Sequence, residues 1–140
     1  MRTIGTDGRI YILNPNKNAR DIQDGSQSSL HLKARGIISS CLPNAIIYEE
    51  VSLTGCRGNK NATLVADFFI PNMGIIIEVH GKQHYEFTSH FHSCIANFEL
   101  SLKNDSIKRE WAELNGLVFI ELPYNKVKSW KKIIADAIEV

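Results

Sequence analysis

Two apolar runs near the middle of the chain each contain one carboxylate. Residues 64–70 read Leu-Val-Ala-Asp-Phe-Phe-Ile, with Asp67 in the fourth position, and residues 75–80 read Ile-Ile-Ile-Glu-Val-His, with Glu78 in the fourth. A turn-forming Pro-Asn-Met-Gly sequence joins the two runs. Runs of this length and composition are typical of buried strands, and two of them around a short turn predict a hairpin. Each strand of that hairpin carries one acidic side chain.

Alternation along the second run turns its last isoleucine and its valine to one side of the sheet. It turns Glu78, His80 and Lys82 to the other side. In a hairpin, Asp67 can lie on that same side. Burying two carboxylates, an imidazole and an ammonium together costs free energy unless a cation or a substrate lies among them. The pattern therefore predicts a binding site on this side of the hairpin.

The rest of the pattern alternates between helical and strand periods. Residues 2–13 predict a small hairpin around an Asp-Gly turn, and the apolar spacing between Ser28 and Pro43 predicts a capped helix. The later elements are a strand at 45–53, an exposed loop at 54–61, a helix at 94–115, a strand at 117–122 and a helix from Asn125. The long helical connection lets the last strand run parallel to a neighbour, so we expect an α/β domain with a mixed sheet.

Length and composition limit the class of protein. A chain of 140 residues with 44% hydrophobic and 22% charged residues is typical of one globular domain. We assign residues 1–27 to the N-terminal hairpin and a polar linker, and residues 28–140 to the α/β domain. The chain has no apolar run of about 20 residues and no secretory leader pattern, so we expect no membrane partner and a cytoplasmic location, the host cytoplasm if the chain is phage-encoded.

Cysteine and charge add two further expectations. The three cysteines are widely spaced without a CxxC pair, which favours free thiols over disulfides or a cysteine zinc site. The formal net charge of +1 gives no global argument for nucleic acid. Local basic groups are the candidates for phosphate contacts, namely Arg57 and Lys60 in the loop and Lys108 in the long helix, with solvated surface charge as the alternative.

The chemistry of the acidic pair points to a hard metal ion. Carboxylates from two neighbouring strands suit Mg²⁺ or Mn²⁺, which activates water and neutralises charge on a phosphate. His80 or Lys82 could then stabilise that charge or move a proton. Another interpretation is a polar strand face without function. A zinc hydrolase is a third, but no HExxH motif is present among the candidate ligands His80, His84, His90 and His92.

One further histidine precedes this region. His31 stands one position from the apolar stripe of the first expected helix. It is either a boundary histidine or a side chain that reaches the pair formed by Asp67 and Glu78. The N-terminal hairpin also has two interpretations: it is either a structural appendage or an arm that contacts DNA.

The motif Ala-Asp-Phe-Phe-Ile-Pro at 66–71, followed by Glu-Val-His-Gly-Lys-Gln-His at 78–84, resembles the active-site hairpin of the PD-(D/E)XK nuclease superfamily. Its ending is similar in particular to the very-short-patch-repair-like branch and to phage and homing endonucleases of that branch. The order of expected elements over residues 28–140 agrees. The resemblance implies a restriction-endonuclease-like mixed β-sheet core of helix, three strands, helix, strand and helix behind the N-terminal hairpin.

Residue by residue, the resemblance implies that Asp67 and Glu78 hold the metal. The lysine position of the superfamily's E-x-K is His80 here, so either His80 or the displaced Lys82 takes that part. His84 matches the histidine that follows the glycine in the branch.

Two acidic positions outside the hairpin also bear on the resemblance. Asp105 falls where the branch often places an acid, and the alternative is a surface pair with Lys108 or Arg109. Many members carry a glutamate on the first helix, whereas this chain has none before Pro43 and offers His31 in that region.

The resemblance thus implies a Mg²⁺- or Mn²⁺-dependent endonuclease that hydrolyses DNA phosphodiesters, without a small-molecule cofactor. The catalytic candidates are Asp67, Glu78, His80, Lys82, His84 and His31. A twofold partner is expected for cutting both strands, with the N-terminal hairpin as the candidate contact. The alternative is a nuclease-like fold that binds nucleic acid or protein without cutting.

Overall fold

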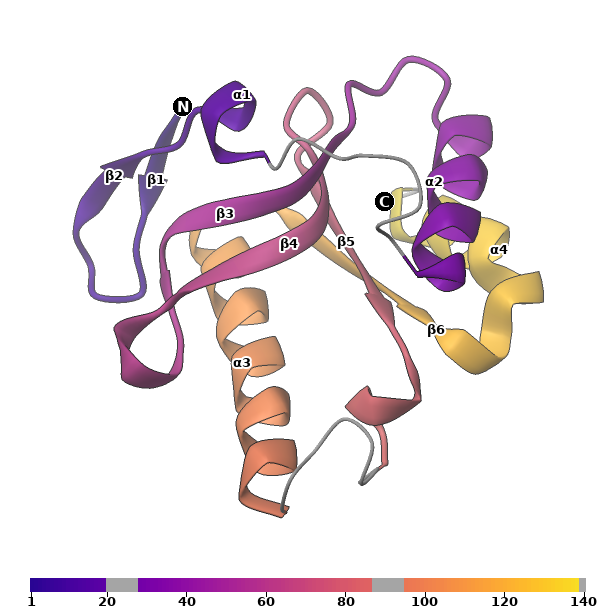
Figure 1. Ribbon diagram of the computed structural model, residues 1–140. Coiled ribbons are helices and arrows are strands. Elements are labelled where there is room, and N and C mark those ends of the chain that lie inside the picture. Colours follow the sequence, from indigo (N-terminus) through magenta and orange to yellow (C-terminus); the bar gives the residue numbers. More distant parts are fainter. Residues whose placement is uncertain (20–27, 87–94, 139–140) are drawn as a thin grey trace.

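A four-stranded sheet in the order β3-β4-β5-β6 lies at the centre of the computed structural model, which describes residues 1–19, 28–86 and 95–138 (Figure 1). The strands are β3 (Tyr48–Arg57), β4 (Thr63–Ile70), β5 (Ile75–His80) and β6 (Val118–Pro123). Neighbouring strands are antiparallel from β3 to β5, and β6 runs parallel to β5. The α/β class, the central hairpin and the parallel last strand expected from the sequence are therefore confirmed.

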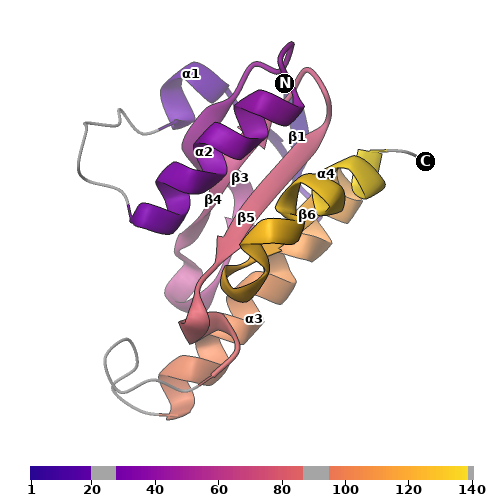
Figure 2. The same cartoon turned by 90° about the vertical axis from the view of Figure 1, so that its right-hand side faces the viewer.

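Helices cover both faces of this sheet. The helices are α2 (Ser29–Cys41), α3 (Ile95–Leu114) and α4 (Trp130–Ile138), with a 3-10 turn (Tyr124–Ser129) leading into α4. Two buried clusters result: one joins α2 and α4 to the sheet around Phe68 and Ile77, and the other joins α3 to the opposite face around Phe69 and Trp111. Figure 2 shows α2 and α4 side by side in front of the sheet, with α3 behind it. Part of the site described below lies between the sheet and α3, and a second part lies where the sheet meets α2.

The strands β3 and β4 change faces at the same level of the sheet. In β3, Glu49 contacts α2, whereas Val51, two residues on, packs on the α3 side. Between them Glu50 has a left-handed backbone, with φ of 51°. In β4, Ala66 packs on the α3 side, whereas Phe68 packs on the α2 side. Strict alternation therefore fails at Glu50 in one strand and at the residue between Ala66 and Phe68 in the other. In β3 the left-handed backbone of Glu50 accounts for the change.

The predicted N-terminal hairpin is confirmed as β1 (Arg2–Ile4) and β2 (Ile10–Ile12), followed by the short α1 (Pro15–Asn18). Leu13 and Asn115 help to hold it on the domain, beside hydrogen bonds that join Thr3 and Thr6 to β3. Leu13 is fully buried in the α3-side cluster, and the Asn115 amide at the end of α3 binds both backbone groups of Ile4. The bonds from Ile4 N and to Ile4 O are 2.7 and 2.9 Å long.

Replacing Asn115 by alanine should loosen the hairpin without unfolding the domain. The change removes two hydrogen bonds to Ile4 and a third to the Trp111 carbonyl, at about 0.5–1.5 kcal/mol each. Hydrogen exchange at Ile4 should therefore accelerate while the core amides of β5 keep their protection. Exchange measured by mass spectrometry on N-terminal peptides checks this, with the exposed Asn125→Ala as control. Unchanged exchange at Ile4 would show that Leu13 and the bonds of Thr3 and Thr6 to β3 hold the hairpin without Asn115.

Several boundaries differ from those expected. The exposed loop expected at 54–61 was wrong over its first half, because β3 continues to Arg57. Gly55 adopts a φ of 81°, and its carbonyl accepts a 3.0 Å hydrogen bond from Thr6, so the hairpin completes the burial of this stretch. Cys41 and Cys56 are free thiols as predicted. Cys94, His90 and His92 lie outside the described residues. Within the described ranges, no helix combines the length and the apolar character needed to cross a bilayer.

Candidate active site

Asp67 and Glu78 lie side by side, each bonded to the strand of the other. The Asp67 amide donates to Glu78 Oε2 over 2.7 Å, and the Val79 amide donates to Asp67 Oδ2 over 2.8 Å. Glu78 is 1% exposed. Burial, followed by the negative charge of Glu78, raises the pKa of the Asp67 carboxyl above its usual range. The expected carboxylate pair is therefore present, and its ionised form is costly without a cation.

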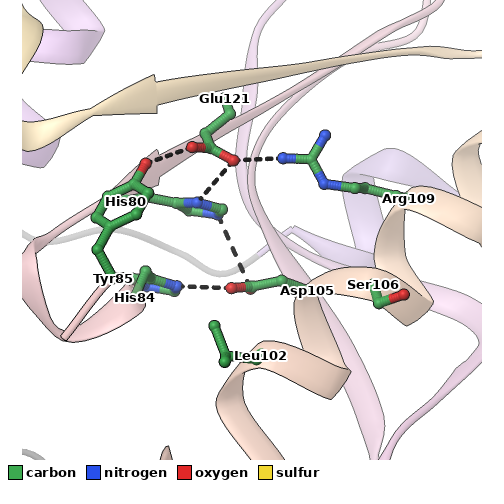
Figure 3. A pocket seen from close by; sticks show the side chains of 8 residues that line it. All are labelled: His80, His84, Tyr85, Leu102, Asp105, Ser106, Arg109 and Glu121. Atoms are coloured by element: carbon green, nitrogen blue, oxygen red, sulfur yellow. Dashed lines mark hydrogen bonds and ion pairs between the residues drawn. The ribbon is translucent and has the colours of Figure 1, made fainter. Parts of the chain in front are cut away.

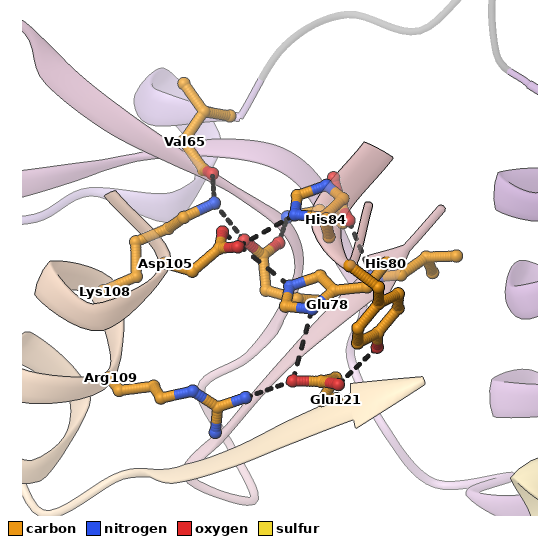
Figure 4. Close-up of polar contacts among 11 residues, drawn as sticks. Val65, Glu78, His80, His84, Asp105, Lys108, Arg109 and Glu121 are labelled. Carbon is orange, nitrogen blue, oxygen red and sulfur yellow. Dashed lines mark hydrogen bonds and ion pairs between the residues drawn. The ribbon is translucent and has the colours of Figure 1, made fainter. Parts of the chain in front are cut away.

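Lys108 supplies one such cation from α3. Its ammonium pairs with Glu78 Oε1 and donates to the Val65 carbonyl over 3.2 Å (Figure 4). Burial alone would lower the pKa of Lys108, but the charge of Glu78 and its hydrogen bond outweigh burial and raise it. The expected phosphate contact at Lys108 is thus replaced in this structure by a buried ion pair inside the site.

Two stacked imidazoles and two carboxylates line a cavity of about 290 Å³ beside this pair (Figure 3). The rings of His80 and His84 are parallel within 2° with centroids 4.2 Å apart. His84 Nδ1 lies 2.8 Å from Asp105 Oδ2 on α3, and His80 Nδ1 lies 3.2 Å from Glu121 Oε1 on β6. Tyr85 and Arg109 also bond to Glu121, which fixes its carboxylate.

His80 offers an unprotonated nitrogen to that cavity. Burial, followed by repulsion from His84, lowers the pKa of His80, so its ring is neutral at neutral pH. A neutral ring that donates from Nδ1 to Glu121 has a lone pair on Nε2. That atom is buried, 3.8 Å from Asp105 Oδ1, and has no hydrogen-bond partner within the described part of the chain. A lone pair facing a carboxylate cannot form a bond, which explains the orphaned atom and leaves it available to a proton or a ligand.

Asp105 is ionised within this cluster. Burial raises its pKa, but the hydrogen bond to His84 and the positive charge of Lys108 oppose burial, and the pKa lies below its usual value. From the sequence, Asp105 was either part of a surface ion pair or a residue of the site. It is 9% exposed and bonded to His84, which supports the second interpretation.

A second cluster lies on the α2 side of Asp67. One ligand atom from each of His31, Glu50 and Asp67 lies within 4.8 Å of the other two. His31 is 5% exposed and stacks on Phe68 with ring centroids 4.5 Å apart. His31 therefore reaches Asp67, one of the two carboxylates of the pair, in agreement with one of its two interpretations.

Other sequence candidates lie away from these clusters. The Lys82 side chain is 60% exposed and pairs with Glu86, so in this structure it does not join the acidic pair. Arg57 and Lys60 are exposed at the β3–β4 connection. Sequence reasoning missed Glu50 and Glu121. The interruption of an apolar run by a charge gave a signal for Glu121, as it did for Glu78. Nothing in the local pattern distinguishes Glu50 from the adjacent Glu49.

Comparisons with known proteins add relatives without a described activity. Uncharacterized protein 307L of Invertebrate iridescent virus 6 is 35% identical over 66 residues, which are 47% of this chain and 34% of that protein. Uncharacterized protein 033L of Invertebrate iridescent virus 3 is 41% identical over 64 residues, 44% of this chain and 31% of that protein. The matched regions thus span about a third of these curated relatives, 34% and 31% of their lengths. No family model matches the chain, and no solved structure gives a significant match.

Proposed function

We propose that the chain is a metal-dependent DNA endonuclease with a restriction-endonuclease-like core of the PD-(D/E)XK kind. The observation that carries the proposal is a pair of hydrogen bonds between β4 and β5. Each of the carboxylates of Asp67 and Glu78 accepts from a backbone amide of the other strand, which holds the two carboxylates next to each other. Such a pair is costly to bury unless it binds a cation. The order of helices and strands around it supports the same proposal.

The donor chemistry fits a hard divalent ion. Asp67 supplies carboxylate oxygen, with Glu78 as the second carboxylate, and oxygen ligands suit Mg²⁺ or Mn²⁺. When bound, such an ion lowers the pKa of a coordinated water and offsets charge on a scissile phosphate. The chain's own part is to orient these carboxylates: the amides of Asp67 and Val79 fix them, and Lys108 compensates the charge of Glu78.

The histidine cluster provides proton transfer. His84 is held through Nδ1 by Asp105, so Nε2 is the nitrogen that can exchange a proton with substrate or water. His80 contributes the free lone pair of Nε2 in the same cavity. DNA phosphates would contact Arg57 and Lys60 at the β3–β4 connection.

The proposed twofold partner is a second copy that contacts the N-terminal hairpin. Ile4, Ile10 and Ile12 are 43%, 63% and 67% exposed on it. Exposed isoleucines on one hairpin are suited to a contact between two copies, because burying them removes apolar area from water.

A second candidate function is binding without cleavage. The ammonium of Lys108 is bonded to Glu78, on the carboxylate that the nuclease would offer to its ion, and His80 stands at the usual lysine position. A protein that binds nucleic acid through the same surface would retain these contacts without needing an ion.

One assay separates the two functions. Supercoiled plasmid, branched DNA and RNA are incubated with the protein in Mg²⁺, Mn²⁺ or EDTA, beside Asp67→Ala and Glu78→Ala. The endonuclease predicts metal-dependent cleavage of DNA that both variants lose, while the exposed carboxylate control Asp136→Asn retains it. Binding of DNA without cleavage under every condition favours the second function, and cleavage that resists EDTA contradicts the metal site.

His84 and Asp105 should behave as one unit in cleavage. Each of His84→Ala and Asp105→Asn should lower the single-turnover rate about 100-fold. The first removes the proton-transfer imidazole, and the second removes the carboxylate that holds it. The double variant should then be no slower than the slower single variant. Rates measured at saturating metal test this, with the exposed Glu113→Gln on α3 as control. Losses that multiply in the double variant would mean that the two side chains act separately.

A further inference from the structure

His31, Glu50 and Asp67 come together from three different elements. His31 lies in the first turn of α2, Glu50 in β3 and Asp67 in β4. The register pairs Glu49 with Phe68 and Val51 with Ala66, so Glu50 and Asp67 lie across from each other at the level where both strands change faces. Their ligand atoms and one ring nitrogen of His31 lie within 4.8 Å of one another. Ligands on opposite sides of one small divalent ion are about 4.2 Å apart, so this cluster is close to ligand spacing.

The His31 ring is held in place on two sides. Its face stacks on Phe68, and its Nε2 lies 2.6 Å from Glu49 Oε1, which also binds Arg35. A metal-binding histidine commonly gives one ring nitrogen to a carboxylate and the other to the ion. Glu49 is therefore suited to orient His31, and Nδ1 is the nitrogen that the ring can give to an ion.

Both carboxylate oxygens of Glu78 already have partners, so Glu78 is less available than Asp67 to bind an ion. Oε1 pairs with Lys108 and Oε2 accepts from the Asp67 amide. Asp67 differs, because its Oδ2 accepts one hydrogen bond from Val79 and its carboxylate is also within reach of Glu50 and His31. Asp67 can therefore share an ion with Glu50 and His31, whereas both oxygens of Glu78 already have partners.

We propose that the ion of this site is bound by His31, Glu50 and Asp67, and that it is Mn²⁺ or another transition-metal ion in preference to Mg²⁺. Glu78 does not contact the ion and instead holds the Asp67 backbone in place by accepting a hydrogen bond from its amide. Imidazole nitrogen suits first-row transition metals, whereas Mg²⁺ favours oxygen and water. The inference rests on the proposed function for the presence of an ion, but it concerns which side chains bind it.

Pulsed electron paramagnetic resonance on the DNA-free protein tests the ligand set directly. The metal-free protein is loaded with Mn²⁺, and the electron spin-echo envelope is examined for ¹⁴N modulation from a bound imidazole. The expected result is ¹⁴N modulation in the wild type that His31→Gln abolishes. His84→Gln, the matched histidine control in the other cluster, should retain it. Mn²⁺ affinity, read from the signal of the free ion, should fall on the order of tenfold or more in His31→Gln.

Glu50→Gln covers the case in which His31→Gln fails to fold. It removes a charge without changing shape, so it should weaken Mn²⁺ binding while the ¹⁴N modulation persists. In the wild type, Mg²⁺ should displace Mn²⁺ only in large excess, and a smaller excess should suffice in His31→Gln.

Three results would overturn the inference: bound Mn²⁺ without ¹⁴N modulation, modulation that His84→Gln removes and His31→Gln retains, or no Mn²⁺ binding at all. The readouts also separate this inference from the proposed function. Nitrogen-coordinated Mn²⁺ in a protein that cuts no nucleic acid would contradict the endonuclease alone. Mg²⁺-supported cleavage by a protein whose bound Mn²⁺ shows no nitrogen coupling would contradict the ligand set alone.

Discussion

Replacing Asp67 by asparagine should abolish DNA cleavage and at the same time stabilise the metal-free protein. Burial and the charge of Glu78 raise the pKa of Asp67, so its ionised form opposes folding. Asparagine keeps an oxygen for the Val79 amide and removes that charge. Replacing a poorly compensated buried charge stabilises by about 1–2 kcal/mol, which corresponds to a rise in Tm of about 3–6 °C for a domain of this size.

The stability that Asp67→Asn gains over the wild type should increase as the pH rises. A carboxyl whose pKa is raised by folding stays protonated in the folded chain after it has ionised in the unfolded chain. The folded state therefore loses stability relative to the unfolded state as the pH rises above the unfolded value of about 3.9. Asp67→Asn and the wild type should have equal stability near that pH and diverge as the pH increases.

Thermal unfolding in EDTA across pH, together with plasmid cleavage in Mn²⁺, measures both effects. Added Mn²⁺ should raise the Tm of the wild type and leave that of Asp67→Asn unchanged, since binding to the folded state alone stabilises it. The exposed Asp136→Asn is the control. A variant that is less stable than the wild type in EDTA would show that the Asp67 carboxylate is structural, and retained cleavage would remove it from the proposed metal site.

Replacing Lys108 by methionine should have the largest effect on stability. The change leaves Glu78, which is 1% exposed, without its buried cation. Breaking a buried ion pair from one side costs about 3–5 kcal/mol. Adding Glu78→Gln to the Lys108→Met chain should recover most of this loss, because no charge then remains to be compensated.

Urea unfolding of the two single variants and the double variant gives the coupling energy between the side chains. The exposed Lys103→Met on the same helix is the control and should change stability little. Additive losses in the double variant would mean that Lys108 stabilises the protein through its bond to Val65 and not through Glu78.

The sequence predicted the elements well where local periodicity was strong. The strand with three isoleucines before Glu78 and the serine-capped α2 follow from patterns within a few residues. The parallel direction of β6 follows from the long helical connection that precedes it. It predicted less well where long-range packing decides: β3 runs on to Arg57 because the N-terminal hairpin covers Gly55, and no local pattern contains that contact. The restriction-endonuclease-like core remains part of the proposed function.

The same division applies to the candidate site. The sequence by itself determined that Asp67 and Glu78 lie together, because a short turn fixes the pairing of two neighbouring strands. Only the tertiary structure decided their partners. Lys108 reaches Glu78 from a helix 30 positions further along the chain, and Lys82 points to Glu86. The left-handed backbone at Glu50 breaks the alternation of β3, and Glu50 and Asp67 lie together with His31, which strict alternation does not anticipate. Hydrophobic pattern reports which side of an element is buried, whereas the choice of an ionic partner depends on how separate elements pack against one another.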